Sequence, residues 1–397
     1  MDNRPALTNL DWSIDPVIDW LVGEGRLVPD LRQQVESLGQ RLVAAGAPLS
    51  RLYVGLQVVH PQLVAMAIVW RPGKEAVEIA RQHGIDKSPA YIGSPMDELR
   101  VTGKPVRYRL TQLPENHHAT LDDMVAEGAT DYYVIPMPFS RGPLPAVTMC
   151  TDRPGGFSDA DLAKLTRVFD HFGASAEAQL NYRLGATLMD TYLGRHTGER
   201  ILQGLIRRGD GETIRAVLWF SDLRNYTGIS EALPAEEVLD ILNFYFETIG
   251  RAIQNHGGDI LKFLGDGLLA IFPVQDAMFL PLACAGALRA AQDALADMDR
   301  MNAGREAADM APIRFGVGLH VGTVTYGNVG TLDRLDFTVI GPAVNRCARL
   351  QSLTKEAGVP ILASAEFNAN CPHPLRPVGR YSMRGIEEPQ DVFTVGG

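Results

Sequence analysis

The sequence has few of the residues that would indicate a disulfide framework, a cysteine-based metal site or a nucleic-acid surface. Its 397 residues include four cysteines, which lie far apart and without C-x-x-C spacing. We interpret them as buried free thiols in a reducing compartment. The 47 acidic residues outnumber the 37 basic ones, giving a net charge of -10, and no basic run stands out. Binding to nucleic acid or to an anionic membrane is therefore disfavoured.

Long apolar runs are also missing. The most apolar window, residues 268–288, is interrupted by Pro273, Gln275, Asp276 and Pro281, which argues against a membrane span. The N-terminal residues are acidic and polar, unlike a signal peptide, so the sequence predicts a cytoplasmic location. A chain of 397 residues is long enough for two or three domains with cores of their own.

Residues 1–157 are predicted to form an α+β domain. Residues 29–48 have the spacing of an amphipathic helix, and short runs rich in β-branched and aromatic residues follow it. The runs interpreted as strands are residues 52–59, 63–70, 131–136 and 146–151. His117 and His118 lie between two of these runs. We interpret them as part of a solvated polar loop rather than as haem or metal ligands.

Residues 158–209 are predicted to form a helical segment that leaves this domain. Ser158 with Asp161 three residues later is a helix-start signal. Apolar residues then follow at 3-4-3-4 spacing: Leu162, Leu165, Phe169, Phe172 and Ala176. This spacing fits a parallel coiled coil between two chains, and it fits equally a helix packed against its own domain.

Residues 210–397 show a regular alternation of strands and helices. The predicted order is β-α-β-β-α-β with additions, the split βαβ arrangement of a ferredoxin-like fold. Strands are expected at residues 213–220, 259–264 and 268–272, helices at 234–255 and 277–301, and a strand pair at 313–326. A helix after Pro342 and a short strand at residues 359–363 complete the domain.

Two aspartates at the ends of apolar runs indicate the chemistry of this domain. Asp222 ends the first strand, and Asp266 lies at the tip of the hairpin in K-F-L-G-D-G-L-L. Two carboxylates brought together hold hard cations, and magnesium usually adds substrate phosphates and water. Asn345 and Arg349, one helical turn apart, add an amide and a cation. The combination favours a nucleoside triphosphate site, although each aspartate taken singly could simply cap a turn.

Five segments in this order resemble the class III nucleotidyl cyclases over about residues 210–396. They are F-S-D-L-R-N-Y-T, H-G-G-D-I-L-K-F-L-G-D-G-L-L-A-I-F, G-V-G-L-H-V-G-T-V, residues 338–350 and R-Y-S-M-R-G-I-E-E-P. The resemblance implies that Asp222 and Asp266 bind two Mg²⁺ or Mn²⁺ ions per site. It also implies that the chain around them, including Phe220, Leu223 and the backbone after Asp222, binds the triphosphate.

The resemblance also implies roles for five polar side chains. Lys262 matches the lysine that reads the purine, and Thr338 stands at its partner position, seven residues before Asn345. A lysine donor and a threonine acceptor suit the N1 and N6 edge of adenine, so ATP is the expected substrate. Asn345 and Arg349 match the pair that orients the ribose and meets charge on the α-phosphate. Arg384 stands where the family usually has a lysine for the terminal phosphates.

Two further positions qualify the resemblance. Threonine at position 338 is typical of a subgroup that is often linked to bicarbonate stimulation, which makes bicarbonate or another small molecule a candidate regulator. Asn225 stands where the family has a glycine, but asparagine tolerates left-handed backbone angles, so the phosphate loop can survive. Arg346, which lies between Asn345 and Arg349 in the chain, is interpreted as a surface salt-bridge arginine.

The predicted function is that of an adenylate cyclase acting as a head-to-tail homodimer. In the family, the two aspartates of a site come from one subunit. The residues at the positions of Lys262, Thr338, Asn345 and Arg349 come from the other subunit. The N-terminal domain resembles a GAF-type sensor in its order of elements, and we expect it to regulate the dimer through residues 158–188. The alternatives are a guanylate cyclase, a diguanylate cyclase suggested by H-G-G-D at residues 256–259, and a catalytically degenerate binding or dimerisation module.

Overall fold

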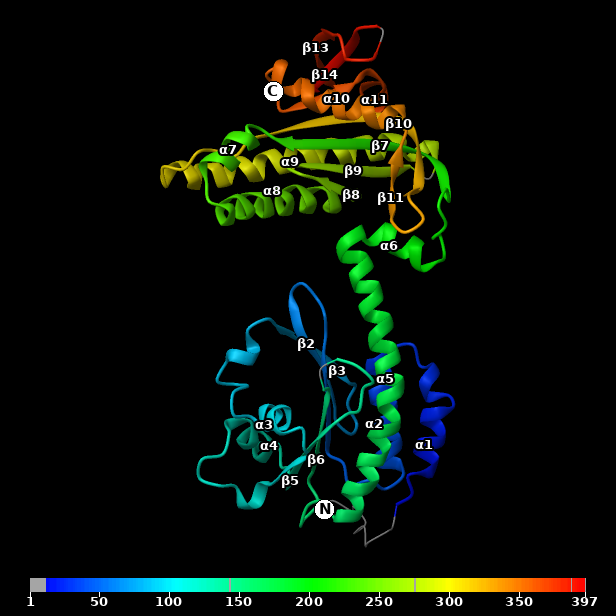
Figure 1. Ribbon diagram of the computed structural model, residues 1–397, viewed down its shortest axis with the longest axis vertical. Coiled ribbons are helices and arrows are strands. Elements are labelled where there is room, and N and C mark those ends of the chain that lie inside the picture. Colours follow the sequence, from blue (N-terminus) through cyan, green and yellow to red (C-terminus); the bar gives the residue numbers. More distant parts are fainter. Residues whose placement is uncertain (1–11, 143, 275, 387, 397) are drawn as a thin grey trace. The chain divides into compact units, whose positions relative to one another are not determined.

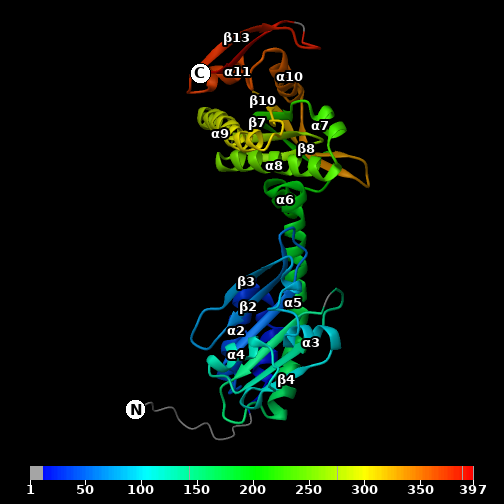
Figure 2. The ribbon, with the colours of Figure 1, turned by 90° about the vertical axis from the view of Figure 1, so that its left-hand side faces the viewer.

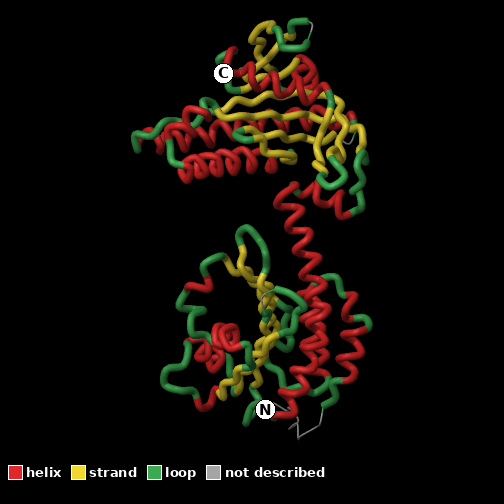
Figure 3. The backbone as a smooth tube through the Cα atoms, in the orientation of Figure 1, coloured by secondary structure: helices red, strands yellow, loops and turns green. Residues whose placement is uncertain are grey.

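The computed structural model describes residues 12–142, 144–274, 276–386 and 388–396. The chain divides into two compact units, Met1–Leu188 and Met189–Gly397. The boundary lies within the long helix α5 (Asp159–Leu193). Each unit combines helices with a sheet, as predicted (Figure 3).

The N-terminal unit is built on a six-stranded antiparallel sheet with strand order β3-β2-β1-β6-β5-β4. The strands are β1 (Arg51–Gln57), β2 (Leu63–Trp70), β3 (Val77–Gln82), β4 (Val106–Arg109), β5 (Asp131–Pro136) and β6 (Ala146–Thr151). The helices before α5 are α1 (Asp15–Val22), α2 (Leu31–Ala44), α3 (Pro95–Thr102) and α4 (Ala119–Ala126), with short 3-10 turns at Gly25–Leu27, Ile85–Lys87 and Leu110–Gln112. Figure 1 shows α1, α2 and α5 on one face of this sheet and α3 and α4 on the other.

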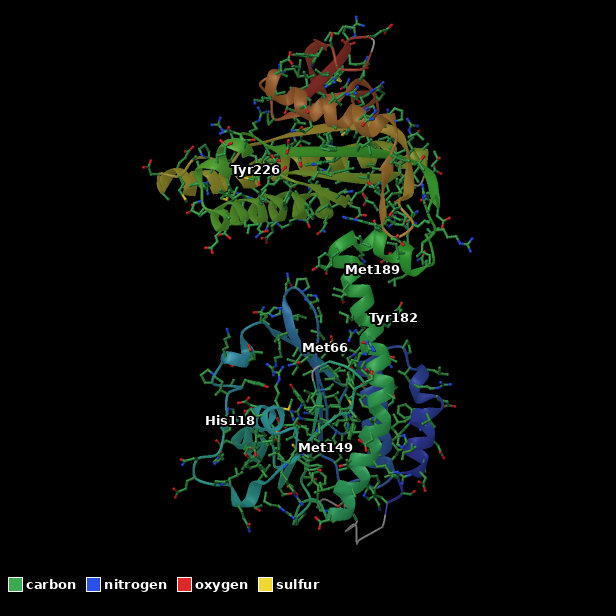
Figure 4. All side chains as sticks on the ribbon, viewed as in Figure 1. Met66, His118, Met149, Tyr182, Met189 and Tyr226 are labelled. Carbon is green, nitrogen blue, oxygen red and sulfur yellow. The ribbon has the colours of Figure 1, made fainter. Side chains whose placement is uncertain are left out.

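The first half of α5 packs against its own sheet. Leu165, Phe169, Phe172 and Ala176 are fully buried in the core that α1, α2 and the sheet share. The 3-4-3-4 spacing in this part of the helix therefore reflects packing against its own domain, rather than a coiled coil between two chains. Further along α5, Tyr182, labelled in Figure 4, is 69% exposed.

The start of α5 is held by the predicted capping residues. The backbone N–H of Ser158 donates to Oδ2 of Asp161 at 2.8 Å, and the N–H of Asp161 donates to Oγ of Ser158 at 3.2 Å. The indole N–H of Trp12 donates to the other oxygen of Asp161 at 2.8 Å. The carboxylate therefore joins the beginning of the helix to the N-terminal segment.

The two neighbouring histidines of the N-terminal unit lie in a polar loop before α4, as predicted. Nε2 of His117 is 2.6 Å from Oδ1 of Asp122. Nδ1 of His118, labelled in Figure 4, accepts a hydrogen bond from the backbone N–H of Thr120 at 3.2 Å. Within the described residues, no group of three or more His, Cys, Asp or Glu side chains is arranged to hold a metal.

Two other sequence expectations concern thiols and membranes. All four cysteines are free thiols; Cys150, Cys284 and Cys347 are buried and Cys371 is half-buried. Among the helices of the described chain, none combines the length and the apolar character needed to cross a membrane.

The C-terminal unit is built on an eight-stranded sheet with order β13-β14-β12-β10-β7-β9-β8, and β11 pairs with β10. The strands are β7 (Gly211–Leu223), β8 (Asp259–Leu264), β9 (Gly267–Val274), β10 (Phe315–Gly330), β11 (Leu335–Ile340), β12 (Ile361–Ser364), β13 (Leu375–Tyr381) and β14 (Gln390–Val395). The helices are α6 (Arg195–Leu202), α7 (Tyr226–Ala232), α8 (Ala235–Asn255), α9 (Leu280–Ala307), preceded by a 3-10 turn at Ala277–Phe279, α10 (Pro342–Glu356) and α11 (Ala365–Asn370). The succession β7-α8-β8-β9-α9-β10 is the predicted β-α-β-β-α-β order.

Helices cover both faces of this sheet. Figure 2 shows α8 and α9 on one side of it and α10 on the other. Alternate residues of β7 explain this, since Val217 and Trp219 belong to the core under α8 and α9, whereas Ala216 and Leu218 belong to the core under α10.

One strand prediction was wrong. The strand pair expected at residues 313–326 is a single strand, β10, whose antiparallel partner β11 lies further along the chain. The glycines of this segment are not turn residues but allow α10 to approach the strand. A Cβ atom at Gly318 would lie 2.5 Å from the backbone nitrogen of Gln351, and one at Gly322 would lie 2.4 Å from Cβ of Ala343.

Candidate functional site

The structure brings Asp222 and Asp266 together. Gly265 and Asp266 form a two-residue turn between β8 and β9, with φ of 67° at Gly265. Asp222 on β7 is paired with Gly267, the residue that follows this turn. The backbone N–H of Leu223 donates to the carbonyl oxygen of Asp266 at 3.3 Å and closes the contact.

The two carboxylates disturb each other electrostatically. Burial of Asp222 and the adjacent carboxylate of Asp266 raise the pKa of Asp222 to about 7. A cation that replaces the shared proton would relieve this repulsion, and carboxylate oxygens are the ligands that Mg²⁺ and Mn²⁺ prefer. Among the described residues, the two aspartates are not part of a larger group of acidic, histidine or cysteine side chains, so other oxygen atoms would complete the coordination.

The loop after Asp222 adopts the conformation expected from Asn225. This residue has φ 60° and ψ 31°, the left-handed region, and Tyr226, labelled in Figure 4, begins α7 directly after it. The glycine-like turn is therefore kept by the asparagine. Leu223, expected to contact substrate, is buried and its N–H is already bonded to Asp266, and Phe220 is half-buried beside the core under α10.

A β-bulge determines where Lys262 points. The register between β8 and β9 shifts between Ile260 and Lys262, so Leu261 is an extra residue in the strand. Without the bulge, Lys262 would share a face with Ile260, which packs on the core under α8. With it, the ammonium group of Lys262 reaches β11 and forms an ion pair with Asp336.

Asp336, the ion-pair partner of Lys262, is a residue that the sequence interpretation did not single out. It lies two residues before Thr338 on β11, so the two side chains lie on the same side of the strand. Thr338 is paired with Gly327 of β10 and is half-buried. The signal in the sequence was the i,i+2 spacing from Thr338, which becomes informative only once the strand is known.

Asn345 and Arg349 lie one turn apart on α10, as expected. Asn345 is exposed, whereas Arg349 is half-buried beside the loop that follows β13. A Cβ atom at Gly385 of this loop would lie 3.3 Å from Nη2 of Arg349, and Gly385 has φ 73°. Glycine therefore lets the loop approach the guanidinium group of Arg349, and the exposed Arg384 directly precedes this glycine in the chain.

Arg346 is a salt-bridge residue, as interpreted from the sequence. Its Nη1 lies 2.7 Å from Oε1 of Glu366. Glu366 also faces the buried imidazole of His320, whose Nδ1 is 2.8 Å from Oγ of Ser364. These contacts join α10 to α11 and are structural.

The predicted site residues thus form two groups. Among the described residues, no hydrogen bond or ion pair joins the aspartate pair to Asn345, Arg349 or Arg384. Asp222 pairs with Gly316 near the start of β10, whereas Thr338 pairs with Gly327 near its end.

Comparison with known proteins gives a consistent result. Residues 212–396 match the family model described as the adenylate and guanylate cyclase catalytic domain. An adenylate cyclase of Anabaena cylindrica is 35% identical over 195 residues, 48% of this chain and 38% of that protein. Adenylate cyclase 1 of Rhizobium meliloti is 33% identical over 182 residues, 45% of this chain and 27% of that protein. The chain thus spans well under half the length of these relatives.

Among solved structures, the adenylyl cyclase CyaB from P. aeruginosa is similar to this chain. The two are 26% identical, with a TM-score of 0.44, and the match covers 47% of this chain and 96% of that one.

Proposed function

Since residues 212–396 belong to the family of adenylate and guanylate cyclase catalytic domains, we propose that this chain converts ATP to 3′,5′-cyclic AMP and pyrophosphate. The observation that carries the proposal is the contact between Asp222 and Asp266, at the tip of a hairpin paired with a central strand. Two carboxylates held this close have little use in a structural role, because they repel each other. They are well suited to a phosphate-binding cation site.

The metal ions would be held by Asp222 and Asp266, as two Mg²⁺ or Mn²⁺ ions per site. Bound there, they would lower the pKa of the ribose 3′-hydroxyl and neutralise charge on the leaving phosphates. The loop that follows Asp222 passes through the left-handed Asn225 into α7, and its backbone would contact the triphosphate.

The remaining polar residues would bind and orient the substrate. The planar, permanently charged guanidinium of Arg349 would meet charge on the α-phosphate, and Asn345 would orient the ribose. Arg384, exposed in the loop whose Gly385 approaches Arg349, would contact the terminal phosphates. Lys262 and Thr338 would read the N1 and N6 edge of adenine. We name no general base, because none of these side chains is an obvious one.

A site of this kind would be shared between two copies of the chain arranged head to tail. The division of the residues into two unconnected groups supports this arrangement, as does the exposure of Asn345 and Arg384 in one chain. Exposed apolar side chains next to the aspartate hairpin, Phe263 at 54% and Leu264 at 41%, offer surface for a second copy. Each dimer would contain two sites.

The N-terminal unit would then regulate the enzyme through α5. This helix begins in the core of the N-terminal unit and ends in the C-terminal one, so a change in the first could bias the dimer of the second. Bicarbonate or another small molecule is the candidate regulator.

Incubation of the full chain with ATP or GTP, with Mg²⁺ or Mn²⁺, followed by chromatography, tests the proposal. We expect cyclic AMP and pyrophosphate from ATP. Cyclic GMP alone would favour a guanylate cyclase, cyclic di-GMP a diguanylate cyclase. No cyclic product under any metal, with and without bicarbonate, would support a degenerate module and overturn the proposal.

A further inference from the structure

The central strand of the N-terminal sheet has two unlike faces. Leu52, Val54 and Leu56 of β1 are fully buried in the core under α2 and α5. The alternate residues, Arg51, Tyr53, Gly55 and Gln57, are polar or small and only half-buried. Figure 1 shows α3 and α4 on that side of the sheet, where a central strand would ordinarily present apolar side chains to a core.

The apolar core on the α3 and α4 side stops before it reaches β1. In the described part of the chain, its strand residues come from β4, β5 and β6, and none from β1, β2 or β3. The members of this core are Leu99, Val106, Leu110, Leu121, Met124, Tyr132, Val134, Ala146 and Cys150. The space between β1 and the two helices is therefore left unfilled.

A cavity of about 400 Å³ occupies this space. Small residues form part of its floor, since a Cβ atom at Gly55 would lie 3.0 Å from the ring of Tyr53 and 3.2 Å from Cε of Met96. Met96 of α3 and Met124 of α4 contribute apolar lining opposite. The volume is that of a site for one small molecule, and methionine side chains adapt to ligands of irregular shape.

Arg51 brings a positive charge to this cavity, and it shares its nearest carboxylate, that of Glu127, with Arg71. Its side chain is only 14% exposed, and its Nε has no hydrogen-bond partner among the described residues. The nearest carboxylate, that of Glu127, is 3.9 Å from Nε and already accepts hydrogen bonds of 3.1 and 2.7 Å from Arg71. The guanidinium carbon lies 5.5 Å from the centre of the Tyr53 ring. A buried guanidinium with an unused donor is costly unless an anion completes it.

The other charges that line the cavity cancel in number. Arg81 and Arg100 are matched by Asp86 and Asp123. Arg100 also donates to the hydroxyl of Tyr91 at 3.2 Å. Among the lining residues, the charge in excess is therefore that of Arg51.

We propose that the N-terminal unit binds a small amphipathic anion in this cavity. Its flat apolar body lies against Met96, Met124 and Tyr53, and its carboxylate, sulfonate or phosphate oxygens bind the guanidinium of Arg51. The planar fork of arginine suits an anionic group with two available oxygens. This inference stands apart from the proposed cyclase chemistry, because it concerns only residues of the N-terminal unit.

Two fluorescent probes that share a ring system and differ in charge test the proposal on the full chain. One is 8-anilinonaphthalene-1-sulfonate and the other is N-phenyl-1-naphthylamine, which lacks the sulfonate. We expect the wild type to bind the sulfonate more tightly. In Arg51→Met, which keeps length and loses charge, affinity for the sulfonate should fall about tenfold or more. Affinity for the neutral probe should stay within about twofold.

The matched control is Arg41→Met, because Arg41 lies over Trp20, 4.7 Å from the ring centre, away from this cavity. It should bind both probes as the wild type does. Equal binding of both probes by the wild type, or an equal loss of both in Arg51→Met, would overturn the proposal.

Circular dichroism and thermal melting show whether Arg51→Met folds. If Arg51→Met does not fold, the test uses the binding of the two probes to the wild type and to Gly55→Leu. The leucine side chain of this variant would fill part of the cavity. That variant should lose both probes, and unchanged binding would overturn the proposal. None of these measurements uses nucleotide turnover, so a failure of the cyclase proposal would leave them interpretable.

Discussion

The ammonium group of Lys262 is paired with the carboxylate of Asp336, two residues before Thr338 on β11. The residue expected to read the purine is therefore held by a charged partner within its own chain. A carboxylate beside Lys262 also offers an acceptor for the exocyclic amine of adenine, in addition to the hydroxyl of Thr338. We therefore propose that Asp336 acts with Lys262 and Thr338 in reading the base.

Replacing this partner should weaken catalysis more than stability. Both side chains are more than one-third exposed, so the pair contributes at most about 1 kcal/mol to folding. In Asp336→Asn we expect kcat/KM for ATP to fall about tenfold, chiefly through KM, because Lys262 loses its charged anchor. Steady-state formation of cyclic AMP measures this. The control Asp333→Asn, in the exposed turn before β11, should match the wild type, and an unchanged KM in Asp336→Asn would remove Asp336 from the site.

The shared site predicts complementation between inactive variants. Asp222→Ala and Arg349→Ala should each lose about a hundredfold or more in rate. Mixed in equal amounts and allowed to exchange, half of the dimers are mixed and each has one intact site, so about a quarter of the wild-type activity should return. Asp222→Ala mixed with Asp266→Ala is the matched control, and it should restore nothing, because both changes damage the same half. Recovery in the control, or none in the test mixture, would contradict the head-to-tail arrangement.

The left-handed conformation of Asn225 makes a prediction about the phosphate loop. Glycine adopts φ of 60° without strain, so Asn225→Gly should keep the wild-type KM for ATP within about twofold. Asn225→Val forces a β-branched side chain into this region at a cost of about 1–2 kcal/mol, and its KM should rise about tenfold. Steady-state kinetics of both variants measures the difference. Equal KM values would show that the loop does not contact the triphosphate.

The carboxylate at the start of α5 predicts a pH dependence of stability. Burial alone would raise the pKa of Asp161, but hydrogen bonds from Ser158, Trp12 and Arg153 outweigh it and lower the pKa to about 2. An unfolded aspartate titrates near pH 3.9, so the folded state favours the charged form. This group therefore stabilises the protein above about pH 4, and the stabilisation is lost as the pH falls towards 2.

The stabilisation that this carboxylate contributes is about 2–3 kcal/mol, from the difference between the folded and unfolded pKa values. Urea unfolding between about pH 5 and pH 2, followed by tryptophan fluorescence, should show the loss in the wild type. Asp161→Asn should be less stable at pH 5 and should lack this part of the decline. Asp159→Asn, whose side chain is fully exposed at the same helix end, should follow the wild type. If the free energy of unfolding fell equally with pH in Asp161→Asn and in the wild type, the pH dependence would not come from Asp161.

Regulation through α5 predicts that the N-terminal residues influence the cyclase. Removing residues 1–190 should change the rate of cyclic AMP formation, or the dissociation constant of the dimer, by about fivefold or more. Sedimentation and steady-state kinetics of the truncated and full chains measure both quantities. A truncated chain that is folded and indistinguishable in both would leave the N-terminal unit without a regulatory role.

Much of the C-terminal unit follows from local patterns in the sequence. The period of the apolar residues predicts α8 and the strands β7, β8 and β9, because helices and strands bury one face at different spacings. The G-D-G turn then brings Asp266 beside Asp222, since a two-residue hairpin leaves little freedom of register. The left-handed Asn225 was likewise foreseeable from its residue type.

The remaining features depend on what packs across the fold. Two features depend on residues that are distant in the sequence. One is the bulge at Leu261, which turns Lys262 towards Asp336, and the other is the set of glycines that let α10 pack closely against β10. The cavity under α3 and α4 is of the same kind, because an alternating strand does not reveal whether its second face meets a core, water or a ligand. Local periodicity thus determined the order of elements and the positions of Asp222 and Asp266, whereas tertiary packing decided the partner of Lys262 and the surroundings of Arg51.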